Sequence, residues 1–172
     1  YALEAAHEMG VIHRDLKPDN IMLLERPGRR DIVRMVTTGT GGWVTERERS
    51  YDFVKILDFG IAKILAPDEL GTDTLQGAVF GTPEYMSPEQ ARGEDVDLRT
   101  DVYALATIAY RCLTGHPAFT GKDVPTTLYD VVYKMPTRPS VLAELPEDVD
   151  RVLAVGMAKD RADRFGTPAE LA

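Results

Sequence analysis

The chain has 172 residues, of which 44% are hydrophobic and 28% are charged. That length and apolar content suffice for one globular domain with a buried core. The formal net charge of -8 argues against a nucleic-acid-binding surface, which is usually basic, and no apolar run reaches the roughly 18 residues typical of a membrane span.

The first predicted element is a helix over residues 2–9. Gly10 ends it, since glycine is favoured directly after the last helical turn. Near the other end of the sequence, residues 167–170 form a capping box with proline at the first helical position, which predicts the start of a helix. Because the sequence begins in one helix and stops early in another, we interpret it as a fragment that is cut at both ends.

A polar loop is predicted directly after the first helix. It combines a carboxylate, a lysine ammonium group and an amide in one short run, His13-Arg14-Asp15-Leu16-Lys17-Pro18-Asp19-Asn20. A hydroxyl that attacks phosphorus needs a proton acceptor within reach, and hard cations such as magnesium bind oxygen ligands. The residue types of this run therefore suit phosphoryl transfer.

Two short strands are predicted next, over residues 21–24 and 54–57, and the second leads into Asp58-Phe59-Gly60. The join between them, residues 25–53, contains a glycine-rich turn that predicts two projecting hairpin arms, over residues 32–38 and 43–45. The join has six arginines and five acidic residues, so it is net +1 while the rest of the chain is -9. A solvated insertion is the simpler interpretation, and a docking arm is the alternative.

The third motif is Gly81-Thr82-Pro83-Glu84-Tyr85-Met86-Ser87-Pro88-Glu89, and helices follow it. Residues 100–114 are apolar nearly all round, which predicts a helix that is buried on every side and ends at Gly115. Cys112 is predicted to be a buried thiol in that helix, and a single cysteine excludes a disulfide framework. Apolar residues at helical spacing over residues 149–157 predict an amphipathic packing helix.

In this chain order the three motifs resemble those of serine/threonine protein kinases, and residues 84–91 resemble the bacterial members. The resemblance implies an α+β, protein-kinase-like fold, mainly the α-helical C-lobe, with a short β-hairpin that carries the catalytic and metal-binding loops. It also implies that residues 1–172 are a kinase-domain fragment without the N-lobe, because only twelve residues precede His13, too few for the family's glycine-rich loop, strand lysine and paired helix glutamate. We therefore expect the fragment alone to be inactive.

The resemblance assigns chemical roles to four residues. Asp15 corresponds to the acceptor of the hydroxyl proton, and Lys17 to a cation beside the transferred phosphoryl group. Asn20 and Asp58 correspond to the magnesium ligands, and together with Lys17 to the residues that bind the nucleotide. The implied cofactors are ATP and Mg2+.

Other positions correspond to structural residues of the family. His13 and Phe59 correspond to side chains that pack in an apolar column beneath the site. Asp101 corresponds to a carboxylate that accepts backbone hydrogen bonds from the catalytic loop. Glu89 and Arg164 correspond to an ion pair that ties the activation segment to the C-lobe.

Arg14, next to Asp15, resembles the residue of kinases whose activation segment is ordered by phosphorylation. The candidate phosphorylation sites are Thr72 and Thr74, the hydroxyl-bearing residues between Gly60 and Gly81, with Thr74 first because its spacing before Gly81-Thr82 resembles that in bacterial receptor-like kinases. Thr82 resembles the serine/threonine kinases, since tyrosine kinases carry a different residue there.

The leading hypothesis is a cytoplasmic, ATP- and magnesium-dependent kinase that phosphorylates serine and threonine hydroxyls of proteins. It includes no nucleic-acid partner and no membrane contact in this fragment. Two alternatives stay open. One is a catalytically inactive C-lobe that serves as a substrate-docking or regulatory module. The other is a small-molecule phosphotransferase of related fold, against which the motif at residues 81–89 argues.

Overall fold

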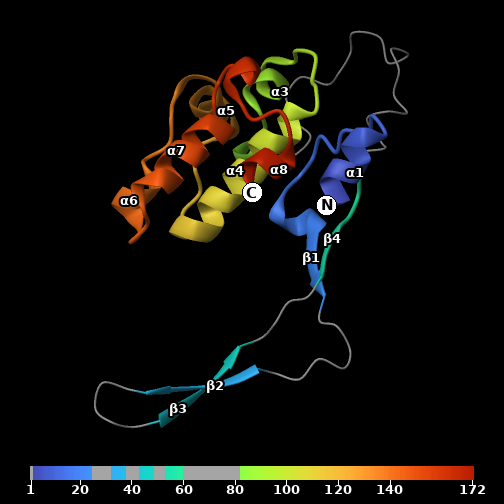
Figure 1. The fold of residues 1–172 in the computed structure, drawn as a ribbon. Coiled ribbons are helices and arrows are strands. Elements are labelled where there is room, and N and C mark those ends of the chain that lie inside the picture. Colours follow the sequence, from blue (N-terminus) through green and yellow to red (C-terminus); the bar gives the residue numbers. More distant parts are fainter. Residues whose placement is uncertain (1, 25–31, 38–42, 49–52, 60–81) are drawn as a thin grey trace.

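The computed structural model describes five stretches of the chain: residues 2–24, 32–37, 43–48, 53–59 and 82–172. Most helices gather in one body, and the strands form two separate two-stranded sheets (Figure 1). The helices are α1 (Ala2–Glu8), α3 (Pro88–Arg92), α4 (Arg99–Thr114), α5 (Val124–Tyr133), α6 (Pro139–Leu142), α7 (Glu147–Gly156) and α8 (Pro168–Leu171). The strands are β1 (Ile21–Leu24), β2 (Ile32–Thr37), β3 (Trp43–Glu48) and β4 (Phe53–Ile56). No helix in these stretches is long and apolar enough to cross a membrane.

Both predicted terminal helices are present. Helix α1 is followed by Gly10 in a left-handed conformation, with φ of 73°. Helix α8 begins with the predicted capping box, in which Thr167 and Glu170 each bind the other's backbone N–H. These two helix boundaries are therefore confirmed, because each depends on local chemistry that the sequence carries.

Helix α4 is the centre of the helical body because it contributes to two hydrophobic clusters. Tyr103, Ala106 and Tyr110 recur at helical spacing and pack in the first cluster with residues of α5 and α7. Ala104 and Ile108 lie on another face and pack in the second cluster with residues of α1 and of the loop after it. The helix is thus buried on most sides along its first three turns.

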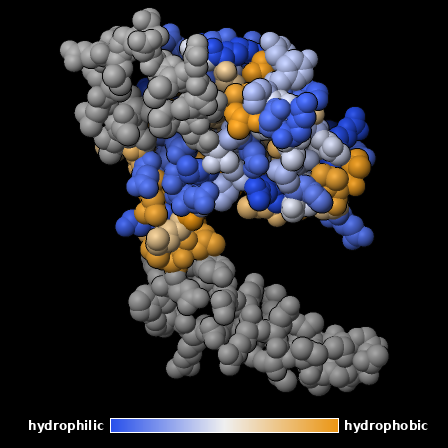
Figure 2. Space-filling model, turned by 180° about the vertical axis from the view of Figure 1, so that it is seen from behind, coloured by the Kyte–Doolittle hydropathy of each residue, from blue (hydrophilic) through white to orange (hydrophobic). Residues whose placement is uncertain are grey.

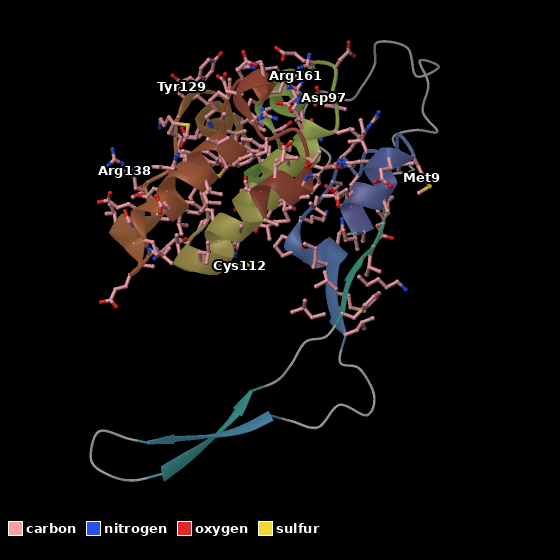
Figure 3. The ribbon with its side chains drawn as sticks, in the orientation of Figure 1. Met9, Asp97, Cys112, Tyr129, Arg138 and Arg161 are labelled. Carbon is pink, nitrogen blue, oxygen red and sulfur yellow. The ribbon has the colours of Figure 1, made fainter. Side chains whose placement is uncertain are left out.

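The prediction of burial on every side is wrong for the last turn of α4, and so is the prediction that Cys112 is a buried thiol. Cys112 is exposed and lies at the far end of the helix (Figure 3). It continues the face of Ala104 and Ile108, but the cluster that covers this face ends at Ile108. Gly115 ends the helix as predicted, in a left-handed conformation.

Helix α7 crosses α4 at close range. Leu153 and Gly156 face the core, whereas Val152 is 38% exposed, so the predicted amphipathic helix is confirmed. A Cβ atom added at Gly156 would lie 2.7 Å from the Cβ of Ala106, nearer than side-chain atoms pack. Glycine at this position therefore sets the distance between the two helices.

The four strands form two antiparallel hairpins. In the first, β1 pairs with β4, with Ile21 opposite Ile56, as predicted within one residue. In the second, β2 pairs with β3, with Ile32 opposite Glu48, so the two predicted arms are present and β3 is longer than expected. The β2–β3 hairpin forms its own sheet and lies beyond the β1–β4 hairpin, away from the helices (Figure 1).

The β1–β4 hairpin exposes hydrophobic side chains. Met22, Leu23, Phe53 and Val54 are between 44% and 52% exposed. Figure 2 shows hydrophobic surface gathered at this hairpin, below the helical body. A contiguous apolar surface of this kind is typical of a face that a ligand or another part of a protein covers.

Candidate active site

The residues predicted to carry catalysis lie in the loop between α1 and β1, and His13 anchors this loop. The His13 side chain is fully buried, its Nε2 lies 2.9 Å from the carbonyl oxygen of Leu57, and its ring centroid is 4.9 Å from that of Phe59. Because a carbonyl can only accept, Nε2 carries the proton, which leaves Nδ1 to accept from the Asp15 N–H at 3.3 Å. Both ring nitrogens are therefore engaged, so neither is free to act as a base.

Asp101 holds the backbone of the same loop from the first turn of α4. Its Oδ2 accepts a hydrogen bond from the His13 N–H at 2.8 Å, and its Oδ1 accepts one from the Arg14 N–H at 2.9 Å. The Nε2 of His7 lies 2.8 Å from Oδ2. A fully buried carboxylate is costly unless such bonds satisfy it. The arrangement therefore couples α1, the loop and α4.

Two polar side chains meet at Asp15. The Nζ of Lys17 lies 3.0 Å from Oδ2 of Asp15. Asn20 donates from Nδ2 to the Asp15 backbone carbonyl at 2.8 Å and lies 3.5 Å from its Oδ2. The side chains of Asp15 and Lys17 stay 33% and 21% exposed, so a second molecule can reach them. The structure thus brings Asp15, Lys17 and Asn20, the three residues of this loop with a predicted chemical role, into contact.

Asn20 and Asp58 lie at the same end of the β1–β4 hairpin. Asn20 directly precedes β1, Asp58 follows shortly after β4, and the Leu57 N–H donates to the Asn20 carbonyl at 2.8 Å. Antiparallel pairing places the start of one strand beside the end of the other. The two predicted magnesium ligands therefore share one edge of the sheet.

The donor set at this edge suits magnesium. Asn20 uses its amide nitrogen within the loop, so its Oδ1 is the atom suited to a cation, and Asp58 offers an exposed carboxylate. Magnesium usually binds through one or two such groups together with substrate phosphates and water. No cluster of three or more His, Cys, Asp or Glu side chains suited to a metal occurs in the part of the chain that the structure describes. These residues would thus supply only part of the coordination sphere.

Backbone strain is concentrated at the same place. Among the described residues other than glycine, Arg14 and Asp58 alone have positive φ, at 65° and 52°. Each such conformation costs about 1–3 kcal/mol and persists only where surrounding contacts enforce it. The hydrogen bonds around the loop supply that enforcement for Arg14.

Arg14 and Thr82 lie around Asp15. Both residues, with Asp15, line a small hollow. The Nε of Arg14 is buried and has no hydrogen-bond partner within the described residues. A buried guanidinium donor without a partner suits an anion. Thr72 and Thr74 lie outside the residues that the structure describes.

Glu89 and Arg164 form a buried ion pair between α3 and the chain near α8. The Nη1 and Nη2 atoms of Arg164 donate to the two carboxylate oxygens of Glu89 at 2.7 and 2.6 Å. Thr100 adds a hydroxyl hydrogen bond to Oε1 at 2.7 Å. A bidentate pair of this kind is specific in geometry as well as strong. It fixes the end of the third motif to the helical body.

The environment of Glu89 changes its acidity. Burial by itself raises the pKa of this carboxyl group, but the hydrogen bonds and the charge of Arg164 outweigh burial. With the Thr100 hydrogen bond, they lower the pKa of Glu89 from 4.5 to about 2. Glu89 therefore stays ionised throughout the physiological pH range.

Two polar residues at the site were missed by sequence reasoning. His7 contacts Asp101, and Gln90 donates from Nε2 to the backbone carbonyl of Arg14 at 2.7 Å. The local signal for Gln90 was its position three residues after Ser87, the third helical position of a capping box. For His7 it was a place one helical turn after Leu3, on the buried face of α1.

Comparison with known proteins gives consistent matches along the whole chain. The model of the protein kinase domain family matches residues 1–171. The chain is 40% identical over 170 residues to the probable serine/threonine-protein kinase PknB of Bifidobacterium longum. This alignment covers 98% of the chain and 21% of that relative. It is 39% identical over 171 residues to the serine/threonine-protein kinase PknB of Mycobacterium tuberculosis, with 99% of the chain and 23% of that relative covered. The chain thus spans less than a quarter of these relatives' length.

Among solved structures, the chain is similar to the kinase domain of Mycobacterium tuberculosis PknI, determined as a mutant. The TM-score is 0.59 and the sequence identity is 27%. The match covers 99% of this chain and 47% of the PknI chain. Similarity therefore extends from the sequence to the arrangement of the helices and strands.

Proposed function

Because this chain belongs to the protein kinase family, with relatives among the bacterial serine/threonine kinases, we propose that it carries the catalytic loop and magnesium ligands of an ATP-dependent serine/threonine protein kinase. The predicted family and the kinase-like α+β fold are confirmed. The observation that carries the proposed activity is the contact of Lys17 and Asn20 with Asp15. Without these contacts, the loop would be only a polar turn.

The geometry supports a separate chemical role for each residue of the site. Asp15 accepts the proton of a serine or threonine hydroxyl while the hydroxyl oxygen attacks the γ-phosphorus of ATP, and the bond from that phosphorus to the β–γ bridging oxygen breaks, so that ADP leaves. Lys17 stabilises the negative charge that develops on the transferred phosphoryl group. Asn20 and Asp58 would hold magnesium through oxygen atoms. Magnesium held there would supply positive charge that neutralises the phosphate groups of ATP.

Two substitutions in the full-length protein test these roles. Asp15→Asn removes the proton acceptor and Asp58→Ala removes a magnesium ligand, so we expect each to abolish turnover while the melting temperature stays near that of the wild type. Asp148→Asn, which changes an exposed acid on α7, is the control and should leave kcat unchanged. Near-wild-type kcat in either active-site variant would contradict its role.

The full-length protein is used because this chain spans less than a quarter of the length of the kinases that it matches. Catalysis is proposed for the cytoplasm, where ATP is available and an exposed thiol such as Cys112 stays reduced. An inactive full-length protein that still binds a protein substrate would favour the alternative of a docking or regulatory module.

Activation is proposed to run through Arg14. A phosphothreonine carries a charge of about -1.5 to -2 and three acceptor oxygens, which match the buried Arg14 Nε that has no partner in the described part. Thr74 and Thr72 are the proposed carriers of that phosphate, and Thr82 is proposed to belong to the same activation segment. Mass spectrometry of the active enzyme should find phosphate on Thr74 or Thr72, and the double alanine variant should be markedly slower. An unphosphorylated, fully active enzyme would contradict the proposal.

A further inference from the structure

The side-chain amide of Gln90 joins two parts of the active site. Its Oε1 accepts from the backbone N–H of Ser87 at 3.1 Å and from the Ser87 hydroxyl at 3.3 Å, which caps α3. Its Nε2 donates to the backbone carbonyl of Arg14 at 2.7 Å, across 76 residues of sequence. Because both ends of the amide are used, its orientation is fixed.

The bond to Arg14 acts on the peptide that leads into Asp15. Arg14 has a left-handed backbone, which residues other than glycine adopt only when contacts hold them there. Asp101 holds the N–H of Arg14, and Gln90 holds its carbonyl. That carbonyl belongs to the peptide bond between Arg14 and Asp15. Rotation of this peptide plane would therefore move the proton acceptor directly.

We infer that Gln90 is a positioning residue for phosphoryl transfer, which acts on Asp15 through the backbone carbonyl of Arg14. The inference rests on the proposed kinase function. Helix α3 directly follows the segment at residues 82–87, so the amide links the placement of that segment to the orientation of Asp15. A misplacement of about 1 Å at a catalytic group can cost roughly 100-fold in rate. One hydrogen bond at this point thus has consequences for turnover.

Two variants of Gln90 distinguish the effect of losing its Nε2 donor from the effect of losing its Oε1 acceptor. Gln90→Glu keeps an oxygen that can cap α3 but removes the Nε2 donor and sets a carboxylate against the Arg14 carbonyl. Gln90→Met removes both polar ends without adding a charge. The control uses the second capping box, where Glu170 accepts from the Thr167 N–H at 3.4 Å. Glu170→Gln is the reciprocal exchange at the same helical position, far from the catalytic loop in sequence.

Steady-state kinetics of the full-length protein give the first readout. We expect kcat to fall about tenfold or more in both Gln90 variants, while KM for ATP and for a peptide substrate stays within about twofold. Glu170→Gln should keep kcat within about twofold of the wild type. An unchanged kcat in both Gln90 variants overturns the inference, and so does an equal loss in Glu170→Gln. Turnover that is absent in the wild type, or that persists in Asp15→Asn, is instead a failure of the proposed function.

Hydrogen–deuterium exchange gives a second readout that does not depend on activity. Backbone amides of residues 13–20 should exchange faster in Gln90→Met than in the wild type, because the hydrogen bond from Gln90 to the Arg14 carbonyl is lost. The same amides should be unchanged in Glu170→Gln. Unchanged exchange of this segment in Gln90→Met would overturn the inference even if kcat had fallen.

Discussion

The helical body and the β2–β3 hairpin are built from contacts of different range. In the body, hydrogen bonds join residues far apart in sequence, such as His13 with Asp101 across 88 residues and Glu89 with Arg164 across 75. Strands β2 and β3 pair with each other in a local register. The comparison teaches that contacts between distant residues hold the candidate catalytic loop in the body, whereas the hairpin depends on its own local pairing. Changes in the body should therefore have the larger effects.

The largest effect is expected when the buried ion pair is broken. Arg164→Met leaves the Glu89 carboxylate buried without its partner, which typically costs about 3–5 kcal/mol of unfolding free energy. Arg161→Met is the matched control, because Arg161 lies on the surface with its Nε 3.9 Å from Asp97 (Figure 3). Exposed pairs contribute about 0–1 kcal/mol. Denaturant unfolding at pH 7 should separate the two variants, and equal losses would remove the distinction between buried and exposed pairs.

Acid should weaken the same buried pair. The pKa of Glu89 is lowered to about 2 in the folded protein, so the ionised carboxylate stabilises the fold fully above its ordinary pKa of 4.5. This stability is lost as the pH falls from there toward about 2, because the Glu89 carboxyl of the unfolded chain takes up a proton in that range while the folded one stays ionised. Glu89→Gln cannot titrate. The difference in unfolding free energy between the wild type and Glu89→Gln should therefore shrink over that window, and a constant difference would contradict the lowered pKa.

Several features of the fold and the site could be predicted because they depend on short-range chemistry. Gly10 and Gly115 end helices through their own backbone preference. The grouping of Asp15, Lys17 and Asn20 was predictable because they lie close together in one motif. Their contacts with one another follow from that spacing once the loop turns.

Other features depend on contacts between distant parts of the chain. The exposure of Cys112 is decided by where the cluster around Ile108 ends, and the sequence of α4 does not carry that information. The bond between Gln90 and Arg14 likewise requires α3 to lie against the catalytic loop. Tertiary packing of this kind is what local patterns leave out.

A moderate effect is expected where α4 and α7 cross. Gly156→Ala gains about 0.5–1 kcal/mol of helix propensity, but the new Cβ would lie 2.7 Å from the Cβ of Ala106. Overpacking of a core costs about 1–3 kcal/mol, so the clash outweighs the gain and the melting temperature should fall. Adding Ala106→Gly makes room, so the double variant should be more stable than the sum of the single changes predicts. Strict additivity would show that the helices move apart freely.

The smallest effect is expected from removal of the insertion. Leu24 lies directly opposite Phe53 in the β1–β4 register, so a two-residue Asn-Gly turn can close this hairpin in place of residues 25–52. Loop closure changes by only about 0.6 kcal/mol for each doubling of loop length, and β2 and β3 pair with each other, so they take no part in the β1–β4 sheet. The shortened full-length protein should therefore keep its melting temperature within about two degrees and its kcat on a generic substrate near that of the wild type. A loss of several degrees would show that the insertion packs on the helical body. Unchanged stability with weaker binding of one protein substrate would favour the docking arm over the solvated insertion.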